Sequence, residues 1–161
     1  MRGTWVFMLV LSTSANALEF AEHAGLKVKL PTGWAKAEAG DETLKVKSDA
    51  AQANVLVRKV PKAEAASPLA FLRDYAKRVA QAKEADQAIE DPVNTKLSAR
   101  EGAAAVLVFA RKDGSHSFQL MYVFPSKHDG IYLVLVCTAP KEKFAGCRKT
   151  MEEIAASLAE E

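Results

Sequence analysis

Alternating apolar and polar residues predict three strands near the start of the chain. Residues 26–30 read "LKVKL", with an apolar residue at every second position. That period is typical of a strand with one buried face. Residues 43–48, "TLKVKS", repeat the alternation, and residues 53–60, "ANVLVRKV", form a more apolar run. The turn "PTGW" between the first two runs brings in Trp34, which we expect to close the core rather than to face a partner.

Two later segments have helical spacing instead. Ser67 and Pro68 predict a helix start, because a serine at the N-cap accepts a hydrogen bond from a backbone N–H and a proline after it has no N–H to satisfy. We expect this helix to run to about residue 83. A second helix opens at Pro140 with apolar residues spaced 3, 4, 3 and 4 apart. These residues are Phe144, Cys147, Met151, Ile154 and Leu158.

Four further strands are expected between the two helices. They cover residues 93–97, 102–111, 116–125 and 131–139. The last three are long and apolar, and the short turns "KDGS" and "SKHDG" join them. Long adjacent strands with glycine-containing turns predict an antiparallel sheet. The fold class is therefore α+β, with a central antiparallel sheet of about six to seven strands and helices packed on it.

Residues 1–17 have the form of a secretory signal peptide. A short positive region precedes an apolar run, and the small-residue sequence Ala-Asn-Ala follows it. A buried N-terminal strand or helix is the alternative interpretation. We expect cleavage between Ala17 and Leu18, which leaves a single α+β domain over residues 18–161. That domain would work in the periplasm or outside the cell. No other segment is long and apolar enough to predict a transmembrane span.

The charge pattern argues against nucleic-acid binding. The chain has 22 lysines and arginines and 20 acidic residues, a net charge of +2, and the two signs are interspersed without a basic run. Binding to nucleic acid needs a clustered positive surface. Apolar residues make up 49% of the chain, which is ordinary for a globular domain, and no internal repeat or linker divides it.

Both cysteines lie near the end of the chain, ten positions apart. Cys137 shares a face of the last strand with Leu133 and Leu135, and Cys147 lies on the apolar side of the helix that follows. If that side packs on that face, the two thiols converge, and in an oxidising compartment such a pair is normally a disulfide. Closing this loop would add about 2–3 kcal/mol of stability. Two buried, reduced cysteines are the main alternative, whereas a redox motif or a zinc site fits the spacing poorly.

The sequence contains no motif that indicates catalysis, a metal or a cofactor. It lacks the common zinc-protease, nucleophile-elbow, phosphate-loop and dinucleotide motifs. We expect His116 and His128 at opposite ends of one strand, and His23 in a loosely held segment. Asp113 and Asp129 each precede a glycine, which is the placement that a turn needs. We therefore predict no catalytic residue, no bound metal and no cofactor.

The order of the elements and several local stretches resemble the PsbP-like family. "LKVKLPTGW" is similar to the family's opening strand, which ends in Pro-x-Gly-Trp. "SPLAFLRDYAKRV" resembles its first helix, and "KLSAREGAAAVLVFA" resembles the two strands after it. "GIYLVLVCTAPKEKFAGCRKTMEEIAASL" resembles its final strand and helix. The resemblance implies an αβα sandwich and a role in binding or assembly. No functional residue carries over, because the matched positions are packing and turn positions.

These observations favour a non-catalytic secreted or periplasmic accessory protein that binds another envelope or extracellular protein. The binding site would be an edge strand or a sheet surface, and the sequence leaves the partner and the oligomeric state open. The alternative is a carrier of a small apolar ligand held between helix and sheet, where small residues such as Ala103 to Ala105 leave room. An enzyme of unfamiliar type, with polar residues brought together from distant segments, is the third possibility.

Overall fold

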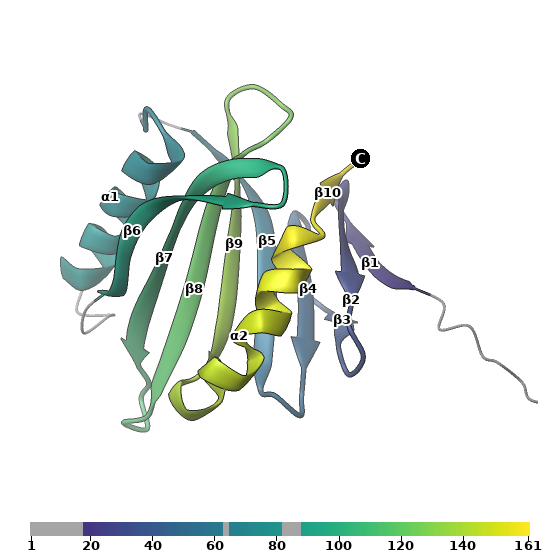
Figure 1. The fold of residues 1–161 in the computed structure, drawn as a ribbon, viewed down its shortest axis with the longest axis vertical. Coiled ribbons are helices and arrows are strands. Elements are labelled where there is room, and N and C mark those ends of the chain that lie inside the picture. The colour runs from purple at the N-terminus through teal and green to yellow at the C-terminus, as the bar shows by residue number, and fades with distance from the viewer. Residues whose placement is uncertain (1–17, 63–64, 82–87) are drawn as a thin grey trace, which may run out of the picture.

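A computed structural model describes residues 18–62, 65–81 and 88–161 of the chain. This part of the protein has ten strands and two helices, and Figure 1 shows how they are arranged. In chain order they are β1 (Glu19–His23), β2 (Leu26–Leu30), β3 (Ala35–Ala37), β4 (Thr43–Ser48), β5 (Ala53–Pro61), α1 (Pro68–Gln81), β6 (Ala88–Leu97), β7 (Arg100–Ala110), β8 (His116–Pro125), β9 (Ile131–Pro140), α2 (Lys141–Ala156) and β10 (Ala159–Glu160). The expected signal peptide and its cleavage position at Ala17 lie outside the described residues, as does the expected helix end near residue 83.

The main sheet has seven strands in the order β3-β4-β5-β9-β8-β7-β6, and every neighbouring pair is antiparallel. This arrangement confirms the predicted antiparallel sheet. Gly114 and Gly130 lie in the turns on either side of β8, with φ of 81° and 75°. These positive values are accessible to glycine without strain, which explains the glycine in each turn.

Each face of the sheet carries one helix and its own apolar cluster. On one face, Leu135 and Val55 pack with Met151 of α2 in a single buried cluster. On the other face, Met121 and Val123 pack with Leu72 of α1. The alternation along each strand sends successive side chains to opposite faces, so the two clusters do not share sheet residues. The predicted αβα sandwich is confirmed.

A second, three-stranded sheet has the order β1-β2-β10. It packs beside α2, and Val28 of β2 belongs to the same buried cluster as Met151. The prediction that His23 is loosely held was wrong, because His23 is paired with Leu26 in this sheet. Residues 19–23 form a strand because β2 supplies the partner. Trp34 is buried in the same cluster, as predicted.

The helix ends follow local hydrogen bonding. Ser67 caps α1 as predicted, since its Oγ accepts a bond from the N–H of Ala70 at 3.1 Å. The last helix ends earlier than its apolar spacing suggests. Ser157 forms the C-cap, and its Oγ accepts a bond from the N–H of Lys29 at 2.9 Å. The chain then turns into β10, so Leu158 is buried but lies outside the helix. Within the described residues, neither helix has the length and apolar character of a membrane span.

Candidate binding face

The three histidines do not form a common site. His116 begins β8 and His128 follows its other end, so a ten-residue strand separates them by roughly 30 Å at about 3.3 Å per residue, as predicted. The ring of His23 bonds through Nε2 to the carbonyl oxygen of Asp41 at 2.8 Å. In the described part of the chain, no group of three or more His, Cys, Asp and Glu side chains is placed to hold a metal ion.

Asp113 has the turn role that its position predicts. The N–H and the Oγ of Ser115 donate to Asp113 Oδ1 at 2.9 and 2.6 Å. These bonds, led by the one from the hydroxyl, lower the pKa of Asp113. The carboxylate therefore stabilises the β7–β8 turn through local bonds, which requires no catalytic role.

Cys137 and Cys147 are buried in the same apolar cluster, on β9 and α2 respectively. The convergence expected from strand parity and helix spacing is thus present. Both are free thiols in the structure. Burial raises the pKa of Cys137, and burial likewise raises the pKa of Cys147, so neither is an activated thiolate. The disulfide between them stays a prediction for the oxidising compartment.

The small residues of β7 are covered by α1. Ala103 and Ala105 are buried in one cluster with Leu72 of that helix, so close helix packing accounts for their size. Two surface hollows of about 510 and 470 Å³ lie elsewhere, one beside Thr95 and Pro125 and the other between β1 and β3. Neither is lined by Ala103 to Ala105, where the sequence suggested room for an apolar ligand.

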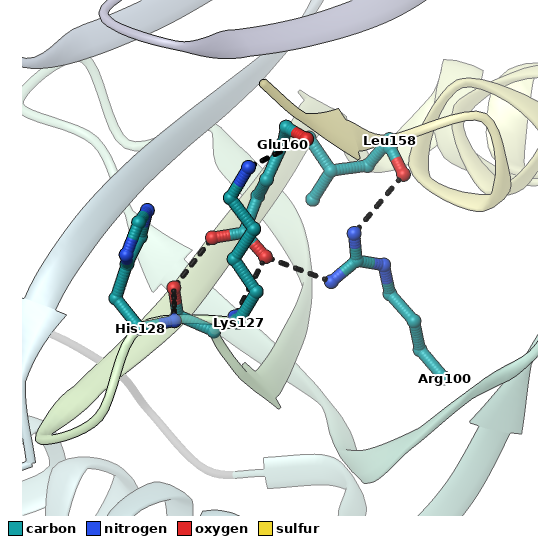
Figure 2. A network of polar contacts seen from close by, with 6 residues as sticks. Arg100, Lys127, His128, Leu158 and Glu160 are labelled. Atoms are coloured by element: carbon teal, nitrogen blue, oxygen red, sulfur yellow. Dashed lines mark hydrogen bonds and ion pairs between the residues drawn. The ribbon is translucent and has the colours of Figure 1, made fainter.

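Figure 2 shows a polar network around the carboxylate of Glu160, which is only 3% exposed. Ser126 Oγ donates to Glu160 Oε1 at 2.5 Å, and the N–H of Lys127 donates to Oε2 at 3.0 Å. Arg100 Nη1 lies 3.4 Å from Oε2, and its Nη2 lies 3.4 Å from the carbonyl oxygen of Leu158. Burial alone would raise the pKa of Glu160, but these bonds outweigh it and lower the pKa. We call this network the Glu160 clamp.

The Glu160 clamp is structural in character. It joins β10 to the β8–β9 turn and to Arg100 at the start of β7. No local pattern around Glu160 predicts this role, because the donors come from distant segments.

A second ion-pair group fastens the edge strand β6 to α2. Arg148 bonds both carboxylate oxygens of Glu90 at 2.5 and 3.0 Å, and its Nε bonds Glu152 at 2.9 Å. The bond from Arg148 lowers the pKa of Glu90. These bonds hold β6 against α2. They account for the lowered pKa of Glu90, which therefore needs no catalytic role.

The edges of the main sheet are poorly suited to pairing with another strand. β6 is interrupted by two register shifts, between Ala88 and Glu90 and between Glu90 and Val93. Pro92 between them has no N–H to offer. The opposite edge, β3, is only three residues long. Bulges, prolines and short strands are the features by which proteins prevent edge pairing.

By the residues that the structure describes, one face of the main sheet is only half covered. Figure 1 shows α1 beside β6 and β7 and away from β4. In a cross-strand row on this face, Lys45 pairs with Leu56, and Leu56 pairs with Val136. The next residue in the row, Met121, is fully buried in the α1 cluster, whereas Leu56 and Val136 are half-buried. Among the described residues, α1 therefore covers β6 to β8, and its cluster reaches Val60 near the end of β5. It leaves β3, β4, the rest of β5 and part of β9 open.

We call this region the open sheet face. Its members are Ala35 and Ala37 of β3, Thr43, Lys45 and Lys47 of β4, Asn54, Leu56 and Arg58 of β5, and Val136 and Thr138 of β9. The opposite side chains of the same strands, such as Val55 and Val57, are fully buried toward α2. The alternation of β5 thus separates a core side from a side that meets solvent.

The open sheet face carries three cations and no acidic residue. Lys47 Nζ lies 3.0 Å from Asp49 Oδ1, at the turn that follows β4. Among the described residues, the side chains of Lys45 and Arg58 have no hydrogen-bond or ion-pair partner. A hollow of about 370 Å³ lies at this end of the face, between Lys45, Asp49 and Asn54. An uncovered sheet surface with unpaired cations is a candidate binding site.

Comparisons with known proteins identify the fold but not a sequence family. No family model and no curated protein sequence matches the chain. The solution structure of cyanobacterial PsbP (CyanoP) from Synechocystis sp. PCC 6803 superposes with a TM-score of 0.59 at 12% identity, over 93% of this chain and 96% of that one. The chain has the PsbP-like fold.

Two further solved structures are similar to this chain. The Ran-binding protein Mog1p of Saccharomyces cerevisiae superposes with a TM-score of 0.58 at 7% identity, over 89% of this chain and 96% of that one. A Bacteroides thetaiotaomicron protein has a TM-score of 0.58 at 18% identity over 88% of this chain. The chain spans about half of that protein, since 47% of its length is covered. At these identities the likeness shows the PsbP-like fold alone.

Proposed function

We propose that this chain is a non-catalytic accessory protein of the periplasm or the cell exterior that binds another protein through the open sheet face. The observation that carries the proposal is the half-covered sheet. The α1 cluster ends at Val136 of β9 and Val60 of β5, and the rest of the face presents the side chains of Lys45 and Arg58 without partners in the described part of the chain. Binding is also the role described for Mog1p, which has the same fold.

Two further observations support binding over chemistry. The groups with shifted pKa, such as Glu90, Asp113 and Glu160, are explained by bonds that hold the fold together. The described hollows bring no pair of shifted titratable groups to one cleft, which is the arrangement that would favour an enzyme. The position of α1 over Ala103 and Ala105 also favours helix packing there over an apolar ligand.

Site-specific photocrosslinking in the protein's own host tests the proposal. A photoreactive residue replaces Lys47 on the open sheet face, Val93 on the β6 edge, or Lys149 on the outer side of α2. All three positions are exposed. We expect a discrete crosslinked band, of higher mass than the chain, from position 47 and none from position 149.

The pattern of crosslinks separates the possible binding sites. A band from position 93 alone would move the site to the edge strand and overturn the open sheet face. Absence of any band at all three positions, with the protein exported and folded, would contradict the accessory role. The signal peptide is checked in the same sample, because cleavage between Ala17 and Leu18 fixes the mass of the uncrosslinked chain.

A further inference from the structure

We propose that the partner of the open sheet face presents a carboxylate-rich protein surface with an apolar residue at its centre. This inference rests on the proposed function and deepens it, because it assigns the chemistry of the partner. It follows from where the cations lie on the face and from what lies between them.

The three cations lie in one line across the face, with Lys45 between Lys47 and Arg58. Lys45 and Lys47 are two positions apart on β4, roughly 7 Å at about 3.4 Å per residue. Leu56 lies opposite Lys45, so Arg58 is the diagonal neighbour of Lys45, at about 7–8 Å. A carboxylate above this group is within about 10 Å of all three cations, which is the Debye length at 0.1 M salt. The three charges therefore act together on one acidic partner.

Asp49, the acidic residue near these cations, does not neutralise the group. Asp49 pairs with Lys47, but both side chains are largely exposed, at 85% and 46%. Exposed ion pairs of this kind contribute little and exchange readily with other partners. The side chains of Lys45 and Arg58 have no pairing at all among the described residues. A guanidinium favours a carboxylate in two-point geometry, so Arg58 is the strongest anchor of the group.

The centre of the face is apolar. Leu56 and Val136 pair across β5 and β9 and are half-buried. Asn54 and Thr138 form the next row and supply amide and hydroxyl groups. A partner residue with a branched apolar side chain fits over the first row, and acidic residues around it reach the cations. Apolar centres with polar rims are usual in protein interfaces.

Three other occupants fit less well. A second copy of this chain would bring the same three cations against each other. Nucleic acid bound on a sheet stacks its bases on aromatic side chains, and the open sheet face has none. An interfacial membrane segment inserts large apolar side chains besides making charge contacts, whereas Leu56 and Val136 are half-buried. The observations therefore favour an acidic protein.

The first probe is a short peptide of three Glu-Leu repeats, followed by amide NMR spectra of the isotope-labelled full chain. Peptides of three Gln-Leu or three Lys-Leu repeats are the matched controls. We expect the acidic peptide to shift the amide signals of β4, β5 and β9 and the control peptides to leave them unchanged. The shifts should disappear at about 0.5 M salt, where the Debye length falls toward 4 Å.

Charge reversal tests the cations directly. The triple variant Lys45→Glu, Lys47→Glu, Arg58→Glu should bind the acidic peptide at least about tenfold more weakly, since three attractions become repulsions. A second triple variant has Gln at the same three positions. It removes the charges without reversing them, and it replaces the charge-reversed variant if that chain does not fold. A control triple variant reverses exposed cations elsewhere with the same change in net charge and should bind like the unmodified chain. Its substitutions are Arg73→Glu, Lys112→Glu and Lys149→Glu.

The outcomes separate this inference from the proposed function. If the acidic peptide shifts other regions, shifts nothing, or binds the reversed chain equally well, the acidic partner is wrong. If position 47 still crosslinks to a protein in the host, the open sheet face remains the binding site, and only the acidic character of the partner is refuted. Tighter binding of phosphatidylglycerol vesicles or of single-stranded DNA to the same strands, at equal salt, would overturn the acidic protein in favour of that class.

Discussion

Removal of the Glu160 carboxylate should loosen the end of the chain. In Glu160→Ala, the hydroxyl of Ser126 and the N–H of Lys127 lose the acceptor that they contact at 2.5 and 3.0 Å. Arg100, at 3.4 Å, makes a longer and weaker contact. The substitution therefore removes two well-formed bonds to a buried charge and one marginal bond.

The magnitude follows from these bonds. A hydrogen bond to a charged group contributes about 1.5–3 kcal/mol, so two well-formed bonds give roughly 3–6 kcal/mol. Restoring the hydration of a buried carboxylate offsets part of that sum. We expect the free energy of unfolding to fall by about 2 kcal/mol in Glu160→Ala. For a domain of this size the midpoint of thermal unfolding should fall by roughly 6 °C.

The effect should depend on pH with a defined sign. The pKa of Glu160 in the folded protein lies below its ordinary value of 4.5. The stabilisation is therefore fully present above pH 4.5 and is lost as the pH falls through the lower folded-state pKa. Glu160→Gln has no titrating group at this position. The difference in unfolding free energy between the unmodified chain and Glu160→Gln should shrink below pH 4.5.

Urea unfolding of the full chain at several pH values measures both effects. Glu153→Ala is the matched control, because Glu153 is exposed on α2 and its side chain has no hydrogen-bond or ion-pair partner among the described residues. A loss in Glu160→Ala no larger than the loss in Glu153→Ala would refute the clamp. A difference from Glu160→Gln that stays constant with pH would show that the carboxylate charge does not matter.

Other substitutions and treatments test the packing. Gly102→Ala should cost about 3 kcal/mol or more in urea unfolding, because its methyl group would lie 2.1 Å from the carbonyl oxygen of Val123. Leu72→Ala should cost about 2–5 kcal/mol, since Leu72 is fully buried between α1 and the sheet; a loss below 1 kcal/mol would contradict that packing. If Cys137 and Cys147 are bonded in the exported protein, alkylation without reductant should label neither thiol in the unfolded chain, and reduction should lower stability by about 2–3 kcal/mol.

Most of the main sheet could be predicted from the sequence because its strands carry their own pattern. In β4 and β5, alternate residues face the core, and the buried set Leu44, Val46, Val55 and Val57 is apolar. The hairpins around β8 were predictable because Gly114 and Gly130 supply the positive φ that their turns need. Local chemistry was sufficient in both cases.

The small sheet could not be predicted, because its pairing is not local. β10 has two residues and pairs with β2, more than a hundred positions earlier in the chain. The Glu160 clamp holds it there with donors from Arg100, Ser126 and Lys127. No pattern within residues 157–161 specifies these partners. The apolar spacing instead extended the helix to Leu158.

The open sheet face was also invisible in the sequence. Lysines, arginines and acids are interspersed along the chain, which predicted no charged surface. The strand register changes this, because it places Lys45 and Lys47 of β4 on the same face as Arg58 of β5, with Arg58 diagonal to Lys45, and leaves acids off that face. Whether a helix covers such a face depends on how α1 docks, and the pattern of α1 does not specify the strands beneath it.

The most direct test of the account compares solvent access of the open sheet face in the host and in isolation. Asn54→Cys places a thiol on the face, in the row of Lys47 and Thr138, and Lys149→Cys places one on the exposed side of α2. The two native cysteines are buried, so they should add little signal. We predict that a membrane-impermeant maleimide labels both new thiols rapidly in the purified chain, but labels position 54 much more slowly than position 149 in intact host envelopes. Equal labelling of the two positions in the envelope would contradict a partner on this face.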